Sequence, residues 1–173
     1  MFTLTILALA LTAQDSSARH VRSTEPTIVM LIEDGIAGSA TFRSLIETLN
    51  ESDVIVYIRL NRNRQALGGY LAHTIVAQGH YRYLSISVET AGSRRRLVSL
   101  LAHELQHAVE VAHAPGARDS ESLERLFSGL AVKFGCGGTS CVETQAAKDV
   151  ERTVNEEFAM PSSVTRRTRP ANR

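Results

Sequence analysis

One stretch of this chain, Leu97–His113, constrains the fold more than any other, because its sequence LVSLLAHELQHAVEVAH predicts a helix with two chemically different faces. Its apolar residues recur at the three- and four-residue spacing of a core-facing helix: Leu97, Leu101, Leu105, Ala108 and Ala112. At about 100° per residue, the opposite face carries His103, His107 and Glu110. The stretch therefore predicts a helix that is anchored on one side and displays polar groups on the other.

The polar face contains the pattern H-E-x-x-H, formed by His103, Glu104 and His107. Helical residues four apart lie one above the other, so two such imidazoles can bind one metal ion with the intervening carboxylate beside it. The alternative is a metal-free protein in which both histidines are ordinary surface residues.

H-E-x-x-H on a long helix resembles the active-site helix of the zincin metallopeptidases. The resemblance implies that His103 and His107 bind Zn2+ and that Glu104 is the general base. Ala108, Val109 and Glu110 follow the motif, in place of the Gly and third His of the metzincins. The third zinc ligand must therefore come from elsewhere in the chain.

Glu143 is the acid that best fits as third ligand. We expect a helix over Val142–Phe158, with an apolar stripe at Ala147, Val150, Val154 and Phe158 and with Glu143 on the centre line of that stripe. A carboxylate directed into a core needs a cation or several hydrogen-bond donors. Glu110 and Asp119 remain alternative ligands. Glu110 would have to reach back past His107, which favours either a role in orienting a histidine or an ordinary place on the surface.

The surroundings of Glu143 also resemble a family element. Glu143-Thr144-Gln145-Ala146-Ala147 is similar to the E-x-x-A-D element of the CAAX-prenyl-protease branch of the gluzincins, the zincins whose third ligand is Glu. This chain has Ala147 where that element has Asp, and it lacks the transmembrane helices of that branch. The resemblance thus implies a small exported gluzincin-like protein of bacterial type.

The rest of the chain predicts an α+β fold: a zincin-like minimal domain with a small, mostly antiparallel sheet packed on the active-site helix, plus further helices. Pro26 can begin a helix, although Ile28–Ile32 could also be a strand. The other expected elements are a helix capped by Ser39, a strand at Val54–Ile58, a loop over Asn61–Gly69, a hairpin of Tyr70–Ala77 and Tyr81–Glu89, a Ser93 cap before the active-site helix, and a helix from Asp119 to Leu130.

Both ends of the chain predict segments outside the folded domain. Residues 1–13 resemble a short signal peptide, residues 14–25 are expected to be a linker, residues 26–160 the metallopeptidase domain, and residues 161–173 a disordered basic tail. An exported protein, periplasmic or extracellular, could form a disulfide between Cys136 and Cys141, although two free thiols are the alternative. No stable membrane anchor is expected after signal cleavage.

These features together predict a zinc-dependent metalloendopeptidase that acts on a peptide or protein substrate. A net charge of +1 gives no reason to expect nucleic acid, and the sequence leaves the oligomeric state open. The family implies that an edge strand binds the substrate backbone, a place assigned here to Tyr81–Glu89, and His113, Tyr83 or an Arg could stabilise the oxyanion. The alternative function is a catalytically inactive zinc-binding or scaffold module of zincin fold.

Overall fold

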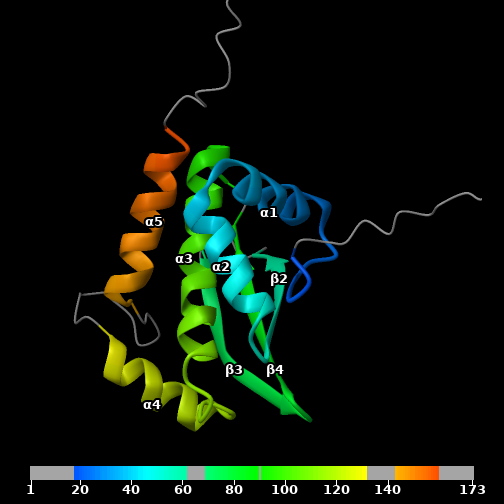
Figure 1. Ribbon diagram of the computed structural model, residues 1–173, viewed down its shortest axis with the longest axis vertical. Helices are drawn as coiled ribbons and strands as arrows, with labels where there is room; N and C mark the ends of the chain where they lie inside the picture. Colours follow the sequence, from blue (N-terminus) through cyan, green and yellow to red (C-terminus); the bar gives the residue numbers. More distant parts are fainter. Residues whose placement is uncertain (1–17, 62–68, 90, 132–142, 160–173) are drawn as a thin grey trace, which may run out of the picture.

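The protein combines a four-stranded mixed sheet with helices, which confirms the predicted α+β class (Figure 1). The computed structural model describes residues 18–61, 69–89, 91–131 and 143–159. The elements in chain order are β1 (Val21–Arg22), α1 (Pro26–Gly38), α2 (Ala40–Asn50), β2 (Val54–Leu60), β3 (Gly69–Gln78), β4 (Tyr81–Val88), α3 (Arg94–Ala112), α4 (Ser120–Leu130) and α5 (Gln145–Glu157).

The described strands lie in the order β1-β2-β4-β3. β1 pairs with β2 and β2 pairs with β4 in parallel, whereas the predicted hairpin of β3 and β4 is antiparallel. The expectation of a mostly antiparallel sheet is therefore wrong. Alternating apolar residues show that one face of a strand is buried, but they carry no information on the direction of its neighbour.

The strand order also corrects the predicted edge strand. Tyr81–Glu89 was expected at the edge, but β4 lies inside the sheet, between β2 and β3. β3 is the edge strand on the side of the antiparallel pair. Its pairing with β4 shifts between Leu71 and Ile75, where residues 72–74 of β3 face Ser85 alone. The irregularity thus lies close to the Gly69 end of the strand.

The expected linker is ordered before residue 26. Val21 and Arg22 pair with Val56 and Tyr57, and Ala18 and Val21 are buried. The prediction of a linker over residues 14–25 is therefore wrong for this part. The strand is only two residues long, too short for a periodic signal in the sequence.

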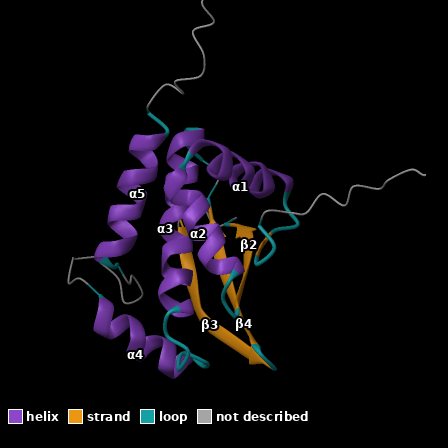
Figure 2. Ribbon diagram, viewed as in Figure 1, coloured by secondary structure: helices purple, strands orange, loops and turns teal. Residues whose placement is uncertain are grey.

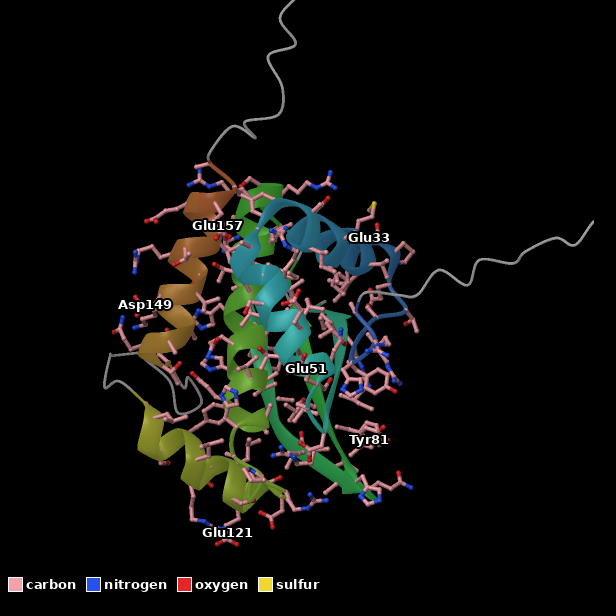
Figure 3. The ribbon with its side chains drawn as sticks, in the orientation of Figure 1. Glu33, Glu51, Tyr81, Glu121, Asp149 and Glu157 are labelled. Atoms are coloured by element: carbon pink, nitrogen blue, oxygen red, sulfur yellow. The ribbon has the colours of Figure 1, made fainter. Side chains whose placement is uncertain are left out.

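Local sequence signals predicted the starts of α1, α2, α3 and α4. Pro26 begins α1, so Ile28–Ile32 is helical. Ser39, Ser93 and Asp119 all act as the expected N-caps. Glu121 and Glu124 are solvent-exposed as expected, and Glu121 points outward in Figure 3. The assignment of Leu130 to the buried apolar stripe of its helix is wrong, because its side chain is 44% exposed.

Helix α3 is the central element of the fold. Helices α1 and α2 and the strands contact it on one side, and α5 packs along it on another (Figures 1 and 2). Burial therefore extends over both faces of α3, including His103, Glu104 and His107. The face predicted to display polar groups is covered by other elements.

The three arginines that begin α3 have protein partners. Arg94 pairs with Asp34 of α1, Arg95 donates to Asn155 of α5 at 2.5 Å, and Arg96 pairs with Glu89 at 2.8 Å. Asp34 and Glu89 compensate positive charge at a helix N-terminus, where the helix dipole disfavours it.

The other end of α3 is held by a fully buried arginine of β4, Arg82. Its guanidinium donates to the carbonyls of Val111, Ala114 and Ala117 and forms a two-pronged pair with Asp53, with Nη2 2.6 Å from Oδ1. The last carbonyls of a helix have no partner within the helix. Of these helix carbonyls, Arg82 donates to those of Val111 and Ala112, and its bonds to Ala114 and Ala117 hold the segment that follows α3 against the sheet.

We expect Arg82→Met to destabilise the protein by about 3–5 kcal/mol, because it leaves buried carbonyls and Asp53 without their donor. Chemical denaturation monitored by circular dichroism would measure the loss. Arg125→Met is the matched control: Arg125 pairs with Glu121 on an exposed helix face, and such pairs contribute little. Equal stabilities for the two variants would contradict the anchoring role.

The same ion pair predicts a dependence of stability on pH. Hydrogen bonding to Arg82 holds the pKa of Asp53 below its ordinary value of 3.8. A lowered carboxyl pKa contributes stability above the unfolded-state value, and this contribution is lost as the pH falls through the folded-state pKa. The stability difference between wild type and Asp53→Asn should therefore be constant near neutral pH and shrink below 3.8. A difference that stays constant to lower pH would contradict this role.

Several predictions fall on residues that the structure does not describe. They are the signal peptide at residues 1–13, most of the loop over Asn61–Gly69, the pair Cys136 and Cys141, and the tail at residues 161–173. Among the described helices, none has the length and apolarity needed to cross a membrane.

Candidate metal centre

The two histidines of the H-E-x-x-H pattern lie one turn apart on α3 and are almost fully buried. His103 is 5% and His107 4% exposed, and their ring centroids are 5.0 Å apart. Phe127 of α4 packs edge-on against the His107 ring at a centroid distance of 5.6 Å. Packing on several sides thus fixes both rings in place.

Each imidazole is bound at Nδ1 by a carboxylate. Glu151 of α5 lies 3.0 Å from Nδ1 of His103, and Glu110 of α3 lies 2.9 Å from Nδ1 of His107. A carboxylate at one ring nitrogen holds the proton there and leaves the other nitrogen as a lone-pair donor. Histidines that bind metals are commonly held in this way. Nε2 of each ring is therefore the atom available to a metal ion.

Glu110 also connects the two helices. The Thr144 hydroxyl donates to Glu110 at 2.6 Å, and the hydroxyl oxygen of Thr144 accepts from the Ala147 backbone N–H at 3.1 Å. Thr144 thus caps α5 and holds the carboxylate that orients His107. One oxygen of Glu110, Oε2, contacts His107, and the other, Oε1, accepts from Thr144.

Glu143 reaches the histidines, but not in the predicted way. α5 begins at Gln145, so Glu143 precedes the helix and the Thr144 cap instead of lying on its apolar stripe. Its Oε1 is 3.6 Å from Nε2 of His103. Two ligands of a tetrahedral zinc ion are about 3.4 Å apart when each bond is about 2.0–2.1 Å. The separation therefore suits two ligands of one metal ion better than a hydrogen bond.

Three residues of α5, namely Ala147, Lys148 and Glu151, follow Glu143 within about two helical turns. Lys148 lies 3.6 Å from Oε2 of Glu143 and compensates part of its charge. Ala147, which replaces the Asp of the similar family element, is fully buried. Glu151, one turn further along α5, binds His103. A longer side chain one turn later thus supplies a carboxylate, where the similar element has its Asp one turn earlier.

Glu104 lies between α3 and the edge strand. It is 4% exposed, and burial raises its pKa to about 6, against the opposing effect of His107 and His103. The backbone N–H of Leu71 in β3 donates to its carboxylate. The group is thus a carboxylate with enhanced basicity, beside the histidines and held by the sheet.

The charges of the site are unbalanced. Burial opposes the charged form of His103, but the hydrogen bond to Glu151 and the negative charges of Glu104, Glu143 and Glu151 raise its pKa above 6.5. Carboxylates around buried imidazoles therefore favour a cation at this place. Of these acids Glu104 is buried, and burial of a carboxylate is costly without compensating charge.

The side chains as they stand do not form a finished cage. Among the described residues, no group of three or more His, Cys, Asp or Glu side chains is arranged to hold a metal ion. The donor types nevertheless fit zinc, since two imidazoles with free Nε2 atoms and one carboxylate are a common catalytic ligand set. A zinc ion at this place would be held by His103, His107 and Glu143, of which Glu143 is 23% exposed.

Other residues considered from the sequence lie elsewhere. Asp119 caps α4, where its side chain accepts from the Ser122 backbone N–H. His113 is exposed at the end of α3. Tyr83 stacks on Tyr57, and it alternates along β4 with Arg82, which faces α3. Neither His113 nor Tyr83 therefore suits the expected role of oxyanion donor.

Sequence reasoning missed Glu151, although a signal was present. Glu151 follows Ala147 by four residues and precedes Val154 by three, so it borders the buried stripe of α5. An acid that borders an apolar stripe needs a partner, and Glu151 has one in His103.

No protein-family model matches the chain, and no curated protein or solved structure matches it either. The case for a metal therefore depends on the residues themselves.

We expect Glu151→Gln and Glu110→Gln each to lower zinc affinity by about 10- to 100-fold, because each variant removes the charge that orients a histidine. Competition with a chromophoric chelator measures this affinity. Glu156→Gln, on an exposed position of α5, is the matched control and should leave it unchanged. Wild-type affinity in both of the first two variants would contradict the orienting role.

Proposed function

We propose that this protein is a zinc-dependent peptidase whose metal is held by His103, His107 and Glu143 and whose general base is Glu104. The observation that carries the proposal is the pair of carboxylate–imidazole contacts at Nδ1, at 3.0 and 2.9 Å, beside a third carboxylate, because Oε1 of Glu143 lies 3.6 Å from Nε2 of His103. A pair of plain surface histidines would need neither burial nor two dedicated acids.

A zinc ion bound by these residues would polarise a carbonyl group and lower the pKa of a water molecule to about 7. Glu104 then accepts a proton from the attacking water as the new bond from oxygen to the peptide carbon forms. Glu104 returns that proton to the amide nitrogen as the carbon–nitrogen bond breaks. Its burial suits this role, because a raised pKa makes the carboxylate a stronger base.

The edge strand offers a place for the substrate. β3 begins beside Glu104 and lies at the edge of the sheet, so a peptide could pair with its backbone and present a bond to the base. Recognition through main-chain groups gives affinity with little demand on sequence. We therefore propose an extended peptide or an unfolded protein segment as substrate, bound along β3 and not along Tyr81–Glu89.

The metal part of the proposal is tested by zinc content. Purified wild-type protein should hold one zinc ion per chain, measured by mass spectrometry, and His103→Ala and Glu143→Gln should bind it more weakly. Chelation should lower the thermal midpoint of wild type, because a ligand that binds only the folded state stabilises it. Wild-type zinc affinity in Glu143→Gln would contradict its assignment as ligand.

The catalytic part is tested by Glu104→Gln. This variant should keep its zinc and lose at least about 100-fold in kcat on a quenched fluorescent peptide library, because it removes the base. Glu124→Gln, at an exposed position of α4, is the control and should keep full activity. Full activity in Glu104→Gln would refute the mechanism. Zinc-loaded wild-type protein that cleaves no peptide would refute the peptidase and support the inactive zinc-binding module.

A further inference from the structure

Gly69, the first residue of β3, makes the closest approach of the edge strand to Glu104. A Cβ atom at this position would lie 3.0 Å from Oε1, 3.2 Å from Cγ and 3.4 Å from Cδ of Glu104. Gly69 is not among the described glycines with positive φ, so its backbone conformation does not call for glycine. Glycine is needed at residue 69 because the Glu104 carboxylate lies too close for a side chain.

Leu71, two residues further along the strand, holds the same carboxylate from its backbone. Its N–H donates to Glu104, and its side chain is buried at 8% exposure. Residues two apart in a strand face the same side, so Gly69 and Leu71 both face α3. The carboxylate thus lies against the Cα of one residue and accepts from the amide of the other.

Glu104 has little freedom to avoid an added methyl group. It is 4% exposed, and the neighbouring turn of α3 carries His103 and His107. A methyl group at residue 69 would force either the carboxylate toward the imidazoles or β3 away from α3. Both movements alter the distance between the base and a peptide bound along β3.

We propose that Gly69 is a positioning residue for the general base: the absence of a side chain at the start of β3 lets the strand and Leu71 N–H hold Glu104 at its working position. The inference rests on the proposed hydrolysis for its effect on rate, but not for its structural part. The irregular pairing of β3 directly after Leu71 separates this short segment from the regular strand beyond Ile75.

The test compares Gly69→Ala with Gly129→Ala, in which the new methyl group has no heavy atom within 4 Å. Gly69→Ala should lower kcat by about 10-fold with KM and zinc affinity unchanged, because the carboxylate must shift by a few tenths of an ångström and a misplacement of about 1 Å costs about 100-fold. Gly129→Ala should match wild type in all three. Wild-type kcat in Gly69→Ala would overturn the proposal.

A double-mutant cycle separates positioning from general damage. Glu104→Asp shortens the side chain by one methylene and withdraws the carboxylate from residue 69. The cost of Gly69→Ala in kcat should therefore be smaller in the Glu104→Asp background. An equal cost in both backgrounds would mean that Gly69 acts on something other than Glu104, and would overturn the proposal.

The NMR signal of the Leu71 amide supplies a readout that needs no activity. Gly69→Ala and Glu104→Ala should both shift this amide proton and raise its exchange rate, whereas Gly129→Ala should not. An unchanged Leu71 amide in Glu104→Ala would overturn the proposal even if Gly69→Ala fails to fold. If wild type cleaves no peptide but the amide responds as expected, hydrolysis fails while the positioning contact stands.

Discussion

Everything in this fold depends on the burial of helix α3 together with its polar residues. A helix covered on both faces can be stable only if its polar side chains find partners inside the protein. His103 and His107 find them in Glu151 and Glu110, and Glu104 finds one in the Leu71 amide. The partners come from α5, from α3 itself and from the edge strand, so the site forms only when these elements meet.

Two anchors keep α3 in place. Arg82 joins its last carbonyls to the sheet and to Asp53, while Arg94 and Arg95 join its first turn to α1 and α5. At the far end of α5, Glu157 accepts hydrogen bonds from Ser39 and Thr41 at the start of α2 (Figure 3). The helices that supply the site are thus connected at points distant from it, which limits how far Glu143 and Glu151 can move relative to the histidines.

The proposed chemistry follows from an imbalance of charge. Carboxylates of Glu104, Glu110, Glu143 and Glu151 surround two imidazoles, and Lys148 compensates only part of their charge. A divalent cation would relieve the remaining repulsion and bring Glu143 into contact with the same ion as His103. In this view, the structural demand for a cation and the catalytic demand for a Lewis acid are met by one ion. The close approach of Gly69 then determines where the base lies relative to it.

The sequence by itself determined the features that depend on neighbours along the chain. Helix α3, its Ser93 cap, the caps Ser39 and Asp119, and the hairpin at Gly79 all follow from periodicity, side-chain acceptors and turn residues within a few positions. The pattern H-E-x-x-H placed two histidines on one helical face for the same reason.

Only the tertiary structure decided which strand is the edge, that Glu143 precedes α5, that Arg82 is buried under the end of α3, and that Glu151 and Gly69 belong to the site. Each of these results from contacts between residues far apart in the chain. The energies of these contacts depend on how whole helices and strands pack against one another, and a local sequence pattern does not indicate that packing.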